Sequence, residues 1–131
     1  MRQKIEFLIL LVLIAFALQG GGSDGDDVTP PTSQPHVLFV EENGTRGRLP
    51  SGQLAIIESS LWRDILDAKR IPWRVVDQDQ AVNDEPWAST LSERDTASTP
   101  WFFASNGRRA KSGDLPVNVA DWQGLMDELF E

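Results

Sequence analysis

Four carboxylates lie where two hydrophobic segments of this sequence end, and together they could do chemistry. They are Glu41, Glu42, Asp77 and Asp79. Ligand sites in open parallel sheets gather at the carboxyl ends of strands, which is where we expect these side chains. Carboxylate oxygens suit magnesium, manganese or calcium, and an Asp-x-Asp tripeptide can hold a metal-bound phosphate. Because such a tripeptide is common by chance, solvated strand ends are the default interpretation, and a small divalent-metal enzyme is the alternative.

Other catalytic groups are scarce, because the sequence has no cysteine and a single histidine, His36. The absence of thiols excludes thiolate catalysis, disulfide bonds and thiolate zinc sites. One histidine at the edge of the expected domain leaves little for catalytic triads or histidine-pair metal sites. We expect His36 to be structural, and we expect no cofactor.

The net charge of the chain limits the classes of partner that it can bind. The net charge is −8, and acidic residues outnumber basic ones in the later, tryptophan-containing part of the sequence as well. A phosphate backbone would be repelled, so nucleic acid is not an expected partner. An anionic lipid surface would repel the domain too. Any membrane contact is therefore expected only through the N-terminal segment.

The carboxylates are positioned by an expected strand-helix-strand unit. Residues 36–41 (HVLFVE) and 73–77 (WRVVD) predict two short strands. The apolar positions between them recur at helical spacing and are Leu54, Ile57, Leu61 and Ile65. Pro72 ends this amphipathic helix. Such a crossover makes the two strands parallel and its hand right-handed.

The second half of the domain predicts a short helix, a hairpin and a final helix. The short helix begins near Pro86 and ends by Glu93. Residues 101–104 and 108–112 flank a tight turn and predict an antiparallel hairpin. Asn118 can cap a C-terminal helix. The apolar face of that helix consists of Trp122, Leu125, Met126 and Leu129.

This order of elements resembles the thioredoxin-like core. The most specific stretch is 98–108 (STPWFFASNGR), which is similar to the thioredoxin hairpin, where a threonine or aliphatic residue precedes a cis-proline. The resemblance implies a three-layer α/β/α fold with a mixed four-stranded sheet over residues 36–131. The Cys-x-x-Cys of the family, expected within residues 43–52, is missing. Dithiol oxidoreductase activity is therefore excluded.

The same resemblance implies a groove for a partner. In thioredoxin-like proteins the backbone beside the cis-proline pairs with an extended peptide, a case of strand addition. The residues expected to form this groove are Thr99, Pro100, Asn43, Thr45, Arg46 and Trp87. Trp87 is included because it lies in a polar stretch and is expected to be partly exposed. The alternative is that Pro100 only shapes a turn.

The N-terminus has the order of an export signal. Basic residues precede an apolar run at 7–18, which as a helix would span about 18 Å, short of the roughly 30 Å hydrocarbon core. Residues 1–18 therefore predict a signal peptide or signal anchor. The residues that follow resemble a bacterial lipoprotein signal, but Gly21 stands where the acylated cysteine would be.

Between the signal and the domain, residues 19–35 are rich in glycine, aspartate and proline and predict a disordered tether. We expect an exported protein, either periplasmic or membrane-anchored through its N-terminus. Its thioredoxin-like domain, lacking redox cysteines, is expected to bind a protein or extended peptide or to act as a scaffold. The rival expectation is the divalent-metal enzyme.

Overall fold

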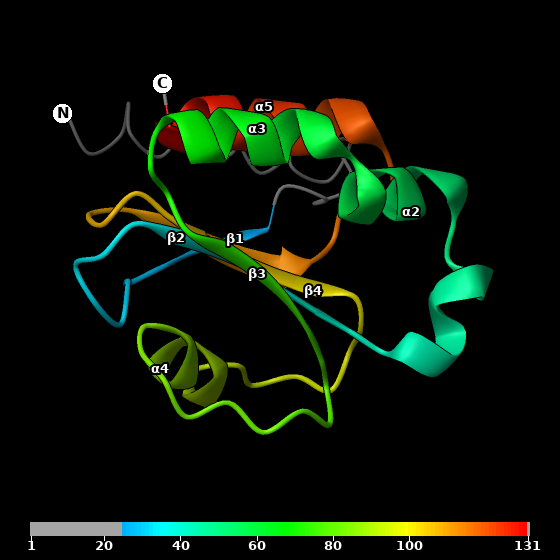
Figure 1. Cartoon of the computed structure of the whole chain (residues 1–131), viewed down its shortest axis with the longest axis horizontal. Helices are drawn as coiled ribbons and strands as arrows, with labels where there is room; N and C mark the ends of the chain where they lie inside the picture. The colour runs from blue at the N-terminus through cyan, green and yellow to red at the C-terminus, as the bar shows by residue number, and fades with distance from the viewer. Residues whose placement is uncertain (1–24, 131) are drawn as a thin grey trace, which may run out of the picture.

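The computed structural model describes residues 25–130, which form a mixed five-stranded open sheet covered by helices (Figure 1). The strands are β1 (Asp26–Val28), β2 (His36–Glu41), β3 (Trp73–Asp77), β4 (Trp101–Ser105) and β5 (Ala110–Asp114). The helices are α2 (Ser51–Glu58), α3 (Ser60–Ala68), α4 (Trp87–Ser92) and α5 (Val119–Phe130), with a 3₁₀ helix, η1, at Asn43–Arg48. The predicted signal and Gly21 lie outside the described residues.

The sheet has the order β1-β5-β4-β2-β3. Strands β2 and β3 are parallel, and the other neighbours are antiparallel. The expected α/β class is confirmed, and so are the strands at 36–41 and 73–77, the hairpin and the C-terminal helix. No helix within residues 25–130 combines the length and apolar character needed to cross a membrane.

The expectation of four strands is wrong, because β1 adds a fifth at the edge of the sheet. Residues 26–28 belong to the segment predicted as a disordered linker, yet they pair antiparallel with β5. All three residues are exposed, so no apolar pattern marks them as a strand. Backbone hydrogen bonds hold the strand in place, and a contact of 3.4 Å between Asp27 Oδ1 and Lys111 Nζ adds to them.

Alternation along β2 divides the core into two clusters. Val37 and Phe39 point to the face that packs against α2, α3 and α5, whereas Leu38 and Val40 point to the face covered by α4. Figure 1 shows α3 and α5 above the sheet and α4 below it. Because both faces are covered, every residue of β2 is buried.

The predicted crossover helix is broken in two at Ser59, whose backbone is extended (φ −69°, ψ 132°). The Ser59 hydroxyl accepts a hydrogen bond from Leu61 N at 3.1 Å and caps α3. A single helical period cannot run through such a break. The apolar face predicted from one period is therefore wrong in its second half: Leu61 is 63% exposed and Ile65 37%. Ile57 is buried as predicted, and Trp62 and Leu66 are buried in place of the two exposed residues.

His36 is fully buried and links β2 to α4 on the face of the sheet that α4 covers. Its Nδ1 donates to the Gln34 carbonyl at 2.8 Å, so in the neutral ring Nε2 is the acceptor. Nε2 lies 2.6 Å from the Thr90 hydroxyl, and the ring stacks on Phe103 with centroids 5.0 Å apart. Burial lowers the pKa of His36 from 6.5, opposed by the Gln34 hydrogen bond and by the charge of Glu85.

We therefore predict that the domain loses stability as the pH falls below about 6.5. Because the folded-state pKa of His36 is lowered, the unfolded chain takes up the proton first, so the stabilising contribution is complete above the unfolded pKa and declines below it. Urea denaturation midpoints between about pH 7.5 and 5.5 measure the slope. His36→Gln should flatten the slope and cost about 1–3 kcal/mol at the higher pH. Equal slopes in both proteins would contradict the prediction.

Candidate functional site

An open cavity of ≈ 690 Å³ lies beside the Thr99–Pro100 peptide bond, which is cis. Its lining comes from the start of β1, the start of α2, the loop before β4, and the chain from the end of β5 to α5. The apolar part of the lining consists of Leu49, Pro50, Pro100, Leu115, Pro116 and Val117. Segments far apart in the sequence thus share one hollow at the end of the sheet.

The first turn of α2 fixes one wall of this cavity. The buried amide of Gln53 donates from Nε2 to the Leu115 carbonyl at 2.7 Å, and Leu115 N donates to the Pro100 carbonyl at 3.0 Å. Gly52 approaches the same loop so closely that a Cβ there would lie 1.9 Å from the Val117 carbonyl oxygen. Position 52 therefore needs glycine, and α2, the loop and Pro100 are held together.

The backbone of Thr99 is open at the edge of the cavity. Its neighbours are engaged: Ser98 N donates to Thr96 Oγ1 at 3.1 Å, and the Ser98 carbonyl accepts from Arg94 at 2.8 Å. Within residues 25–130, nothing forms a hydrogen bond with the N–H or the C=O of Thr99. These two groups can therefore pair with an extended segment from elsewhere.

Of the expected groove residues, only Thr99 and Pro100 line the cavity. Asn43, Thr45 and Arg46 lie in η1 nearby, and their hydrogen bonds and charges are used within the domain. The Asn43 N–H donates to Asp77 Oδ1 at 2.8 Å, and the Thr45 hydroxyl donates to the Glu42 carbonyl at 3.2 Å. η1 therefore serves as an exposed, hydrogen-bonded connection between β2 and the cavity wall.

Trp87 does not lie at the cavity, and the expectation that it is partly exposed is wrong. The residue begins α4 on the other face of the sheet and is 5% exposed. It packs edge-on against His36, with centroids 5.4 Å apart, and the Arg74 guanidinium covers its ring at 4.7 Å. A tryptophan in a polar stretch is thus buried by residues distant in the sequence.

The cavity residues that the sequence did not indicate come mainly from 113–117 and from Gly25 and Asp26. A Leu-Pro pair at 115–116, apolar within a polar connection, is the one local signal that could have drawn attention to this loop. Gly25 and Asp26 gave no such signal, since they were assigned to the linker.

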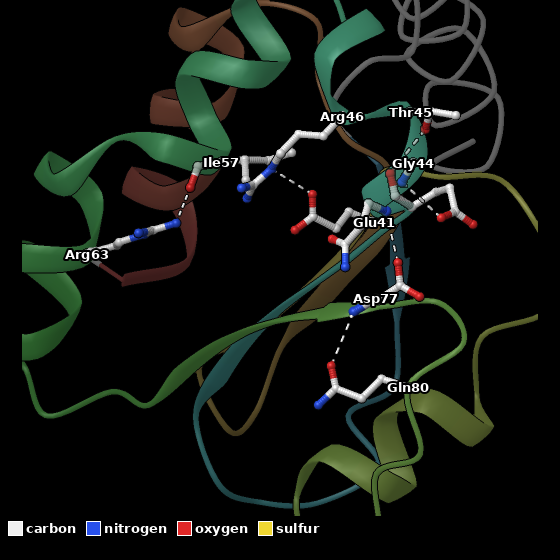
Figure 2. A network of polar contacts seen from close by, with 10 residues as sticks. Glu41, Gly44, Thr45, Arg46, Ile57, Arg63, Asp77 and Gln80 are labelled. Carbon is white, nitrogen blue, oxygen red and sulfur yellow. Dashed lines mark hydrogen bonds and ion pairs between the residues drawn. The ribbon is translucent and has the colours of Figure 1, made fainter.

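The four carboxylates predicted as metal candidates are divided by the structure. Glu41 points to the face covered by α2, α3 and α5 and is buried. Its Oε1 lies 2.9 Å from Arg46 Nε (Figure 2). This contact is an ion pair without the alignment of a hydrogen bond. Arg63 lies behind it, donates to the Ile57 carbonyl and stacks over Trp73 at 4.6 Å. Burial lowers the pKa of Arg63, and the charge of Arg46 lowers it further.

We predict that Arg46→Ala destabilises the domain by about 1–3 kcal/mol, because it leaves the buried Glu41 carboxylate without its partner. Adding Glu41→Gln should recover part of the loss by removing the charge. Arg48→Ala, a change to an exposed arginine of the same 3₁₀ helix, is the matched control and should cost less than about 0.5 kcal/mol. Equal losses for Arg46→Ala and Arg48→Ala, measured by chemical denaturation, would argue against the ion pair.

The other three carboxylates do meet. Ligand atoms of Glu42, Asp77 and Asp79 all lie within 4.8 Å of one another. The two oxygens of Asp77 accept from Asn43 N at 2.8 Å and from Asp79 N at 3.0 Å. Figure 2 shows the Asp77 carboxylate directed toward the start of η1. These backbone donors hold the pKa of Asp77 below its ordinary value of 3.8.

Glu42 is tied in the same manner. Its Oε1 accepts from Gly44 N at 3.1 Å and its Oε2 from Gln78 Nε2 at 2.5 Å. Each carboxylate oxygen has a further lone pair, so the set can still take up a hard divalent cation. The same hydrogen bonds join the carboxyl ends of β2 and β3, so the three carboxylates also have a structural role without any cation.

Comparison with protein-family models, with curated proteins and with solved structures gives no match for this chain. The thioredoxin resemblance therefore stays a prediction drawn from the sequence. The structure offers a cavity with an open backbone edge and, separately, three converging carboxylates.

Proposed function

We propose that this chain is a thioredoxin-like domain without redox cysteines that binds an extended peptide segment in the cavity beside Thr99 and Pro100. The observation that carries the proposal is the coincidence of an apolar hollow with an unpaired backbone. Thr99 offers one N–H and one C=O at the edge of the hollow, and both lack a partner among residues 25–130. The chain has no thiol with which to do redox chemistry on a bound segment.

Strand addition divides recognition into two parts. Main-chain hydrogen bonds to Thr99 hold any extended segment, whatever its sequence. Alternate side chains of that segment point the same way, so one of them can enter the hollow. At ≈ 690 Å³ the hollow is in the size range of ligand sites, about 300–1,000 Å³. Leu49 and Val117 supply apolar surface for that side chain.

The order of elements supports the thioredoxin-like part of the proposal. A parallel β2 and β3 joined by helices, then the short α4, then the hairpin and α5, follow one another as the resemblance implies. The N-terminal apolar run supports the proposed setting, which is outside the cytoplasm, in the periplasm or tethered to a membrane through the segment before Gly25.

A displayed library of random peptides tests the binding function. We expect the full chain, held in detergent, to select peptides that lose about tenfold or more in affinity on Val117→Arg, a change of about 1.4 kcal/mol or more. Val117 is 55% exposed and lines the cavity, so arginine there obstructs the hollow without disturbing the core.

Val119→Arg is the matched control, since Val119 is 48% exposed, lies two residues further on and does not line the cavity. Both changes add one positive charge. Peptides bound equally well by both variants and by the unchanged chain would place binding elsewhere on the domain and refute the proposal.

A second candidate is divalent-cation binding at Glu42, Asp77 and Asp79, as the metal-enzyme expectation requires. The observation that favours it is the convergence of the three side chains within 4.8 Å at the carboxyl ends of two parallel strands.

Calorimetric titration with magnesium, manganese and calcium tests this candidate. If it is right, one cation binds with a dissociation constant of about 1 mM or tighter, and Glu42→Gln abolishes the heat. Asp95→Asn, a change to an exposed loop carboxylate outside the set, should leave the heat unchanged. Failure to detect binding below about 1 mM removes the candidate.

A further inference from the structure

We infer that the peptide segment is cationic and carries lysine or arginine next to an apolar residue. The inference rests on the proposed binding function and gives the chemical class of the partner. It follows from the distribution of charge around the cavity. The apolar lining and the backbone of Thr99 do not select for the charge of a bound segment, but the charged residues do.

A second hollow of ≈ 330 Å³ lies next to the cavity, on the α4 side of β1. The two share Asp26, Ser98, Gly113 and Asp114 in their linings. They are therefore adjacent at the edge formed by β1 and β5, and an extended segment paired with Thr99 can reach both of them. We call this surface the acidic trough.

Four carboxylates line the acidic trough: Asp26, Glu93, Asp95 and Asp114. Among the described residues, no lysine, arginine or histidine lines either hollow. Within residues 25–130, none of the four side chains takes part in an ion pair or a hydrogen bond. Some acidic residues elsewhere in the domain do form ion pairs, such as Asp84 with Arg74 at 2.9 Å.

A basic residue that adjoins the lining in sequence is used internally. Arg94, between Glu93 and Asp95 in the sequence, donates to the Ser98 carbonyl, and its guanidinium covers the Trp101 ring at 5.8 Å. Four carboxylates against one inward-turned guanidinium leave the acidic trough negative. A cationic segment meets complementary charge there, whereas an acidic segment meets repulsion.

The apolar lining and the charged rim together define the segment. An apolar side chain occupies the hollow by Leu49 and Val117, and lysine or arginine on either side reaches Asp26, Asp114 or Asp95. Because the rim is exposed to water, each charge pair adds little by itself. Several pairs acting together still give a preference that depends on ionic strength.

The sequences selected from the random peptide library test this inference. We expect lysine and arginine to be enriched about twofold or more over the starting library, with aspartate and glutamate depleted. Asp95→Asn with Asp114→Asn should reduce the enrichment and weaken the selected cationic peptides about threefold or more. Glu58→Gln with Asp64→Asn, which removes two exposed charges that line neither hollow, is the matched control and should change neither.

The outcomes separate the two proposals. Peptides whose binding depends on Val117 but which are not enriched in basic residues would overturn the cationic partner and leave the binding function standing. Enrichment that falls equally in both double variants would also overturn it, since the net charge of the chain, and not the trough, would then be attracting the peptides. If no selected peptide depends on Val117, both proposals fail.

Discussion

The fold depends on one constraint, which is that β2 is buried along its whole length and on both faces. A strand in that position needs a neighbour on each edge and a helix layer on each side. It pairs with β3 on one edge and β4 on the other, while α2, α3 and α5 cover Phe39 and its neighbours and α4 covers Leu38 and Val40. The two core clusters follow from that placement. So does the position of Glu41, because side chains alternate along a strand and Glu41 is directed to the same face as Val37 and Phe39, the one covered by α2, α3 and α5.

Elements with a strong local pattern were predictable from the sequence. The four apolar residues at 37–40, the run at 73–77 and the four-residue apolar face of α5 are each visible within a few residues, and the structure has all three elements. The prediction was wrong where a single residue or a contact between distant parts of the sequence determines the secondary structure. Ser59 resets the helical phase through its own backbone, and β1 is held by hydrogen bonds to β5 that leave no mark in its composition.

The candidate site was harder to predict, for a related reason. Thr99 and Pro100 were found because they lie in one recognisable stretch, but the wall opposite them comes from Gln53 and Leu115, which meet only through a side-chain bond across the fold. Trp87 shows the converse case. A polar sequence context suggested exposure, yet Arg74 and His36, neither of them close in sequence, enclose its ring.

The chain enters the described domain at Gly25, and that residue and Asp26 belong to the wall of the cavity. Any load carried by the preceding segment is therefore applied at the rim of the hollow, through a strand of three residues paired on one edge only. So short an edge strand is the element of the sheet that opens at least cost in free energy. Tension applied to the N-terminal segment would therefore distort the cavity before it distorted the core. A ligand bound in the cavity would be the first contact to weaken.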